Sequence, residues 1–75
     1  MTLDDFVKAF AEQFDELAPE TINKATMFKE VEGYSSLVAL SVLNMVDKKM
    51  GKDILLADLM MADTVEDLYD VILSK

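Results

Sequence analysis

Histidine, cysteine and arginine are all absent from this chain of 75 residues. Without histidine or cysteine the chain has no imidazole base, no thiolate nucleophile and no ordinary zinc site. The lack of cysteine also excludes disulfides, which makes the reducing cytoplasm the expected location. Because every basic residue is a lysine, a guanidinium group cannot provide bidentate recognition of phosphate or guanine. We therefore expect a protein that is not itself an enzyme.

Long hydrophobic runs are lacking as well. No run approaches the ~18 apolar residues of a membrane-spanning helix, and the chain does not begin with the basic and then apolar segments of a signal peptide. Fifteen acidic residues against seven lysines give a net charge of -8. Such a charge repels nucleic acids and anionic membranes. The composition therefore predicts no nucleic-acid binding and no membrane insertion, and it favours basic proteins as partners.

Proline and glycine are scarce, with one and two copies, whereas 52% of the residues are hydrophobic. This composition is typical of a globular, helix-rich protein. A chain of this length forms one domain with one modest core. We expect an all-α fold, with a single domain over residues 1–75 that acts as a monomer. The expected architecture is a small four-helix bundle with three longer helices, one short helix and a long loop between the first two.

The first expected helix begins at Thr2, which has the spacing of a capping box with Asp5, and ends at Pro19. Apolar residues recur along it at the spacing of one helical face, namely Leu3, Phe6, Val7, Phe10, Phe14 and Leu17. Residues 18–34 predict a long ordered loop, pinned to the core by Ile22, Phe28 and Val31. Loops of this length inside compact domains are usually functional.

A second helix is expected to begin at Ser35–Ser36 and to run to about Met50, with Gly51 as its stop signal. Its apolar residues cover more than one stripe, so that one face is left over when the other packs into the core. A connector with Ile54 in the core and one or two helical turns over residues 57–61 should follow.

The last helix is expected from Asp63–Thr64, with a second capping box formed by Thr64 and Asp67. It should bury four apolar residues at helical spacing, namely Val65, Leu68, Val71 and Ile72. The whole core is predicted to contain Phe6, Phe10, Phe14, Phe28, Leu43, Val46, Ile54, Leu68 and Ile72.

The stretch FKEVEGYSSL, residues 28–37, brings a serine to the first turn of a helix beside the leftover apolar face. The first amides of a helix lack intrahelical partners and lie at the positive end of its dipole, so a phosphate diester on the Ser36 hydroxyl is stabilised there. Taken alone, however, a serine at a helix start is more simply a capping residue.

From near Glu12 to Ile72 the chain resembles acyl carrier proteins. The family pattern is Phe-x-x-x-x-Gly-x-Asp-Ser-Leu, an apolar helix, an Ile-containing connector and a Thr-Val pair. This chain supplies Phe28, Gly33, Ser36, Leu37, Leu40, Ile54, Thr64 and Val65 in order. The resemblance implies a covalent 4'-phosphopantetheine arm on Ser36, with Ser35 as the helix cap beside it. It also implies that Leu37 and Leu40 face partner enzymes. We expect Ser41 and Asp47 on the same helix to flank them in the partner-binding surface.

The function that this resemblance implies is to hold acyl intermediates as thioesters in fatty-acid or specialised polyketide-like biosynthesis. The implied partners are a phosphopantetheinyl transferase and the acyl-chain synthases, reductases and transferases. The thiol belongs to the cofactor, so the missing cysteine and histidine are no obstacle.

The chain departs from the family in its charges. Ser35 replaces the family's aspartate; it can cap the helix but adds no negative charge. Residues 36–50 hold one acid, Asp47, and two bases, Lys48 and Lys49. These departures indicate a specialised carrier with dedicated partners.

Three other kinds of protein share features with this sequence. An unmodified carrier-like interaction module fits the same fold, because fold does not fix function. A peptidyl-type or polyketide-type carrier shares the chemistry and differs in cargo. A calcium-binding helical protein is rejected, because carboxylates are missing at the required spacing around Gly33 and Gly51.

Overall fold

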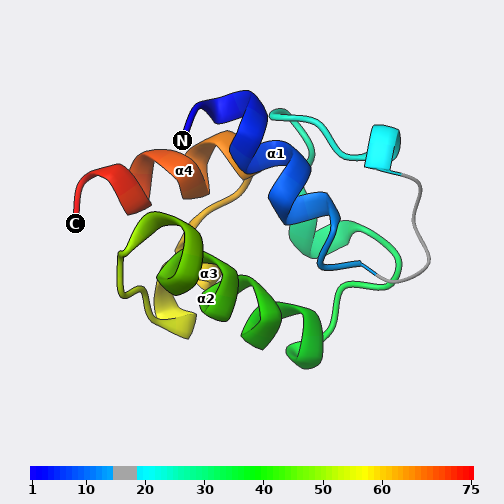
Figure 1. The fold of residues 1–75 in the computed structure, drawn as a ribbon. Coiled ribbons are helices and arrows are strands. Elements are labelled where there is room, and N and C mark those ends of the chain that lie inside the picture. The colour runs from blue at the N-terminus through cyan, green and yellow to red at the C-terminus, as the bar shows by residue number, and fades with distance from the viewer. Residues whose placement is uncertain (15–18) are drawn as a thin grey trace.

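The computed structural model describes residues 1–14 and 19–75, and this part of the chain is helical with no strand. The elements are α1 (Leu3–Ala11), α2 (Ser36–Met50), α3 (Leu56–Met61) and α4 (Val65–Leu73), with two short 3-10 turns at Pro19–Thr21 and Phe28–Glu30. α1 packs against α4 and α2, and the short α3 packs against α2 and α4 (Figure 1). The predicted all-α bundle of three longer helices and one short helix is confirmed. None of the described helices is long and apolar enough to cross a membrane.

The predicted caps of α1 and α4 are both present. The Asp5 amide donates to Thr2 Oγ1 at 3.1 Å, and the Thr2 amide donates back to Asp5 Oδ2 at 3.4 Å. The same pair of bonds joins Thr64 and Asp67, each at 3.1 Å. Two amides at each helix start thus gain acceptors that the helix itself cannot provide.

The predicted end of the first helix is wrong, because α1 stops at Ala11 rather than near Pro19. The Gln13 side-chain amide donates to the Ala9 carbonyl at 2.9 Å, while the backbone amides of Gln13 and Phe14 turn to carbonyls three residues back. Bonds of this kind tighten the chain into a 3-10 turn and end the helix. Phe14 is still buried, but from beyond the helix. The predicted contact of Leu17 lies outside the described residues.

The loop before α2 is fastened to the start of α4. The Val65 amide donates to the Thr26 carbonyl at 3.1 Å, and the Glu66 amide donates to the Lys24 carbonyl at 3.0 Å. Loop carbonyls therefore satisfy two first-turn amides of a helix about forty residues further along the chain. Ile22 and Phe28 are buried, and Val31 packs against the core from a half-buried position, as predicted.

α2 has the predicted bounds. It ends at Gly51, whose backbone is left-handed with φ +65° and whose amide donates to the Asp47 carbonyl at 3.1 Å. Glycine adopts this conformation without the steric cost that a Cβ adds. Ile54 in the following connector is buried, as predicted.

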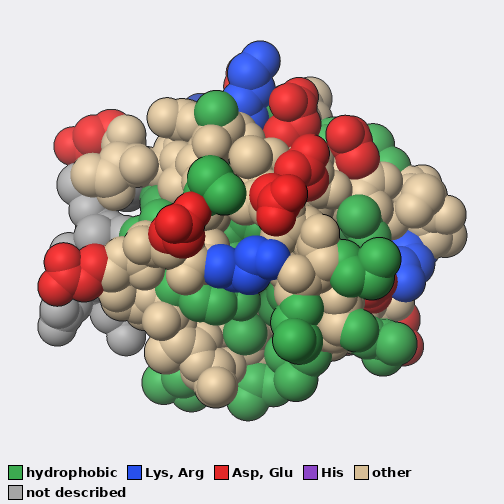
Figure 2. All heavy atoms as spheres, turned by 180° about the vertical axis from the view of Figure 1, so that it is seen from behind, with side chains coloured by type: hydrophobic (Ala, Val, Ile, Leu, Met, Phe, Trp, Pro, Cys, Tyr) green, Lys and Arg blue, Asp and Glu red, His purple; other side chains and the backbone are tan. Residues whose placement is uncertain are grey.

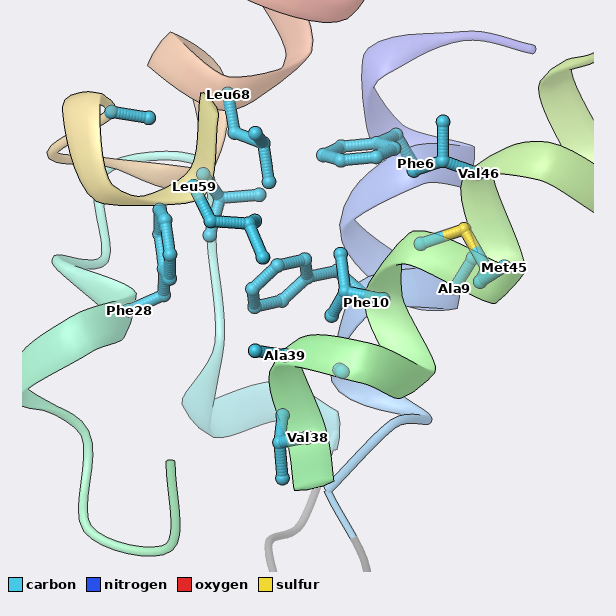
Figure 3. Packing of buried hydrophobic residues seen from close by; sticks show 14 of the residues in the cluster. Phe6, Ala9, Phe10, Phe28, Val38, Ala39, Met45, Val46, Leu59 and Leu68 are labelled. Atoms are coloured by element: carbon cyan, nitrogen blue, oxygen red, sulfur yellow. The ribbon is translucent and has the colours of Figure 1, made fainter. Parts of the chain in front are cut away.

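The core lies where all four helices meet the loop. In Figure 3, Phe10 lies near the middle of the labelled side chains, and Phe28, Leu59 of α3 and Leu68 of α4 lie to one side of it. Eight of the nine predicted core residues are buried, namely Phe6, Phe10, Phe14, Phe28, Val46, Ile54, Leu68 and Ile72.

Two residues that were predicted to be buried, Leu43 and Val71, are only partly buried, although Leu43 still packs against the core. The buried stripe of α2 instead consists of Val38, Ala39, Val42, Met45 and Val46. These positions repeat at helical spacing, and Leu43 lies at the edge of their stripe.

Candidate functional site

Two adjacent serines at the start of α2 have different roles in the structure. Ser35 is the N-cap: its backbone is extended, and its Oγ accepts from the Val38 amide at 3.4 Å. Its carbonyl accepts from the Ala39 amide at 2.9 Å. Ser36 is the first residue of α2 and is exposed, and no described residue hydrogen-bonds its hydroxyl. Capping therefore belongs to Ser35, which leaves the Ser36 hydroxyl available for chemistry.

A glycine turn delivers the chain to this helix start. The Tyr34 amide donates to the Val31 carbonyl at 3.0 Å, and Gly33 inside this turn has φ +97°. A Cβ on Gly33 would meet nothing closer than Phe14 Cδ2 at 4.0 Å. The backbone angle, rather than crowding, is therefore what requires glycine at this position.

The electrostatics at the start of α2 favour an anion. The first turn of α2 contains no acidic residue, and the last turn contains Lys48 and Lys49. The free amides and the dipole of the helix give its start a partial positive charge. The backbone would therefore stabilise a phosphate group attached to the Ser36 hydroxyl.

A pocket of about 280 Å³ lies beside Ser36, between α2 and α3. Its lining is mainly apolar and consists of Tyr34, Ser35, Ser36, Ala39, Leu40, Leu56, Leu59 and Met60. This volume is just below the roughly 300–1,000 Å³ found for small-molecule sites. The pocket suits a short, largely apolar group.

One wall of the pocket is formed by α3, a role that the sequence did not predict. The pocket is lined by three residues of α3, namely Leu56, Leu59 and Met60. The sequence predicts only one or two helical turns over residues 57–61 and assigns no function to them. The available signal was their spacing, because positions i, i+3 and i+4 share one face of a helix. Only Leu59 of the three is buried, and Met60 is 74% exposed.

Tyr34 is held in the pocket wall by other aromatic rings. Its ring lies 5.6 Å from that of Phe28, at an interplanar angle of 66°, and 6.4 Å from that of Phe14. Burial raises the pKa of the Tyr34 phenol above its ordinary value of 10.0. The phenol therefore stays neutral, and able to donate a hydrogen bond, throughout the physiological pH range.

The predicted partner residues are only partly brought together. Leu37 and Leu40 are exposed on the first turns of α2, close to Ser36, and Ser41 is half-buried. Asp47 is exposed about three turns further on, ~16 Å along the axis at 1.5 Å per residue. It therefore lies away from the pocket and next to Lys48 and Lys49.

The exposed apolar surface is larger than the sequence suggested. In addition to Leu37 and Leu40, the side chains of Leu55, Leu56, Met60 and Met61 on and before α3 are exposed. Figure 2 shows acidic side chains gathered over the upper part of one face of the molecule and hydrophobic side chains over its lower part. Of these side chains, Leu40, Leu56 and Met60 line the same pocket, and exposed apolar side chains that gather in this way are typical of an interaction site.

Comparison with known proteins identifies the family. A family model described as a phosphopantetheine attachment site matches residues 4–72. The chain belongs to this family. The match implies a covalently attached 4'-phosphopantetheine arm, and carriers of this family work with transferase and synthase enzymes. No curated protein and no solved structure matches the chain.

The residues at the start of α2 fit such an arm. An attachment residue needs an accessible hydroxyl, and Ser36 offers one that no described residue engages. The carrier also has an apolar pocket adjacent to that hydroxyl. Members of the family are typically not catalytic themselves.

Proposed function

We propose that this carrier holds acyl intermediates as thioesters on an arm attached to Ser36, in fatty-acid or specialised polyketide-like biosynthesis. The observation that supports Ser36 as the attachment residue is that the two serines at the start of α2 have different roles. Ser35 caps the helix, whereas the exposed Ser36 hydroxyl is left free by the described residues. The proposal includes a monomeric single domain in the cytoplasm that performs no catalysis of its own.

When bound, the arm supplies the thiol that carries the acyl group. The chain's own residues stabilise the phosphate, shelter the cargo and contact the partner enzymes. The first-turn amides and the dipole of α2 stabilise the phosphate, and the apolar pocket shelters the start of a short cargo from water. Leu37 and Leu40, both exposed beside Ser36, offer an apolar contact to partner enzymes.

The second candidate is an unmodified interaction module with the same fold. The replacement of the family's acidic residue by Ser35 favours it, because a transferase that contacts this charge would recognise the chain poorly. The exposed apolar side chains of α2 and α3 would serve such a module equally well.

Intact-mass analysis separates the two candidates. The protein is incubated with coenzyme A and a broad-specificity phosphopantetheinyl transferase. We expect a mass gain of one phosphopantetheine group in the wild type, its loss in Ser36→Ala and its retention in Ser35→Ala. Circular dichroism confirms that each variant is folded. A gain that survives Ser36→Ala would mean that another residue is modified, and the absence of any gain with every transferase would favour the interaction module.

A further inference from the structure

Tyr34 lines the pocket beside Ser36 and carries a hydroxyl that neither the fold nor the arm uses. Of its lining residues only Tyr34, Ser35 and Ser36 have polar side chains. The Ser35 hydroxyl accepts from the Val38 amide, and Ser36 is the proposed attachment point. No described residue hydrogen-bonds the Tyr34 hydroxyl. Among the lining hydroxyls, that of Tyr34 thus has no role in the fold or in the arm, and a polar group of this kind in an apolar lining can select a ligand.

The ring that carries this hydroxyl packs against other aromatic side chains. It packs edge-on against Phe28, which is fully buried, and also contacts Phe14, which is 5% exposed. The turn closed by the Tyr34 amide fixes the backbone of the same residue. A donor on a rigid ring loses little entropy when it binds a ligand oxygen.

We propose that Tyr34 selects the cargo: its hydroxyl donates a hydrogen bond to a keto or hydroxyl oxygen of a short acyl group in the pocket, so that the carrier shelters oxygenated acyl groups better than plain hydrocarbon chains. This inference rests on the proposed function. A site that hydrogen-bonds a ligand rejects an analogue without the oxygen more strongly than an apolar pocket discriminates between chain lengths.

The structure offers a matched control in the second tyrosine of the chain. The Tyr69 hydroxyl donates to the Met1 carbonyl at 2.7 Å, and its ring lies 5.3 Å from that of Phe6. Tyr69 does not line the pocket. Each of the variants Tyr34→Phe and Tyr69→Phe therefore removes one phenolic oxygen. Only Tyr34 lies next to the proposed arm.

The test loads the wild type and both variants with two acyl groups of equal length, one with a 3-hydroxyl group and one unsubstituted. The readout is the half-life of the thioester in mildly alkaline solution, followed by intact mass. A net hydrogen bond of ordinary strength corresponds to a factor of about two to ten. We expect the 3-hydroxyacyl group to be hydrolysed faster by this factor on Tyr34→Phe than on the wild type. The unsubstituted group should be unaffected, and Tyr69→Phe should match the wild type with both.

Equal half-lives on wild type and Tyr34→Phe for the 3-hydroxyacyl group would overturn the inference. So would an equal change for both acyl groups, because the hydroxyl would then serve the arm or the fold rather than the cargo. Failure of the proposed function is seen separately and earlier, as a wild-type chain that accepts no arm, and it would overturn this inference as well.

Discussion

Asp58 holds the start of α3 through its carboxylate, which accepts from the Leu55 amide at 2.8 Å and pairs with Lys75 Nζ at 3.0 Å. The backbone hydrogen bond, followed by the lysine, lowers the pKa of Asp58 below its ordinary value of 3.8. A lowered folded-state pKa means that the carboxylate adds stability above the unfolded value, and that this contribution is lost as the pH falls through the folded pKa.

Asp58→Asn mimics the protonated side chain at every pH. We therefore expect it to lower the melting temperature at neutral pH, and the gap from the wild type to close as the pH falls well below 3.8. Asp53→Asn is the control, because Asp53 is exposed and has no partner among the described residues. Thermal unfolding followed by circular dichroism at several pH values measures both gaps. A gap for Asp58→Asn that stays constant into strong acid would show that the charge is not the cause.

α3 is held to the molecule by few contacts. Leu59 is its only buried residue, and the Lys29 ammonium donates to the Met60 carbonyl from across the loop. The same ammonium lies 6.0 Å from the centroid of the Phe28 ring. A cation at the carboxyl end of a helix satisfies carbonyls that have no intrahelical partner. Lys29 thus links the loop to the helix that forms one wall of the pocket.

Lys29→Met keeps the aliphatic stem and removes this link. We expect amide hydrogen exchange in α3 to become about two- to ten-fold faster, as for the loss of one net hydrogen bond of about 0.5–1.5 kcal/mol. Protection in α1 and α4 should change little. Lys24→Met is the control, because only the backbone carbonyl of Lys24 is engaged. Unchanged exchange in α3 would mean that the burial of Leu59 and the contacts of Asp58 hold the helix without Lys29.

The surface of α2 has little negative charge close to the attachment point. Its first turn has no acid, and its one acidic residue, Asp47, is followed by two lysines. Electrostatic complementarity acts mainly on association rate and specificity. A transferase that selects acidic helices should therefore modify this chain slowly.

Adding Ser35→Asp and Ser41→Glu should speed modification by such a transferase up to about ten-fold at low salt, with a steeper salt dependence than the wild type. The pair Ser35→Asn and Ser41→Gln is the neutral control of similar size. Initial rates followed by intact mass give the comparison. Equal rates for the acidic and neutral pairs at low salt would show that apolar contacts through Leu37 and Leu40 dominate.

Short sequence motifs predicted those helix ends that are determined by interactions between residues close in sequence. The capping boxes, the serine pair and Gly51 fix both ends of α2 and the starts of α1 and α4, and all of these were predictable. Periodicity alone overestimated α1, because Phe14 continues the apolar spacing although the backbone has already turned. The pocket could not be predicted in this way, because it exists only where α3 meets α2. That packing depends on contacts distant in sequence.

The whole molecule carries far more charge than it pairs. The net charge is -8, and the described residues contain a single ion pair, between Asp58 and Lys75. Unpaired like charges destabilise a compact state by self-repulsion, and salt screens them over about 10 Å at 0.1 M. The fold should therefore be less stable at low ionic strength than in salt.

We expect the melting temperature at neutral pH to rise with sodium chloride and with divalent cations. The double variant Glu12→Gln and Glu32→Gln removes two exposed charges and should show a higher melting temperature at low salt and a weaker dependence on salt. Calorimetry over a range of ionic strengths makes the comparison. A melting temperature indifferent to salt in both proteins would contradict this account.

The hydrogen bonds from Val65 and Glu66 to carbonyls of the loop have a consequence for cutting the chain. The acceptors at Thr26 and Lys24 belong structurally to α4, although they precede it by about forty residues. A cut just before Ser35 would separate α4 from these acceptors, and would also separate Phe10 and Phe28 from Leu59 and Leu68. Each fragment would therefore lack hydrogen-bond partners and core side chains that the other fragment contains. Neither should be helical alone, whereas an equimolar mixture should regain helical circular dichroism, as a protein assembled from two complementary pieces.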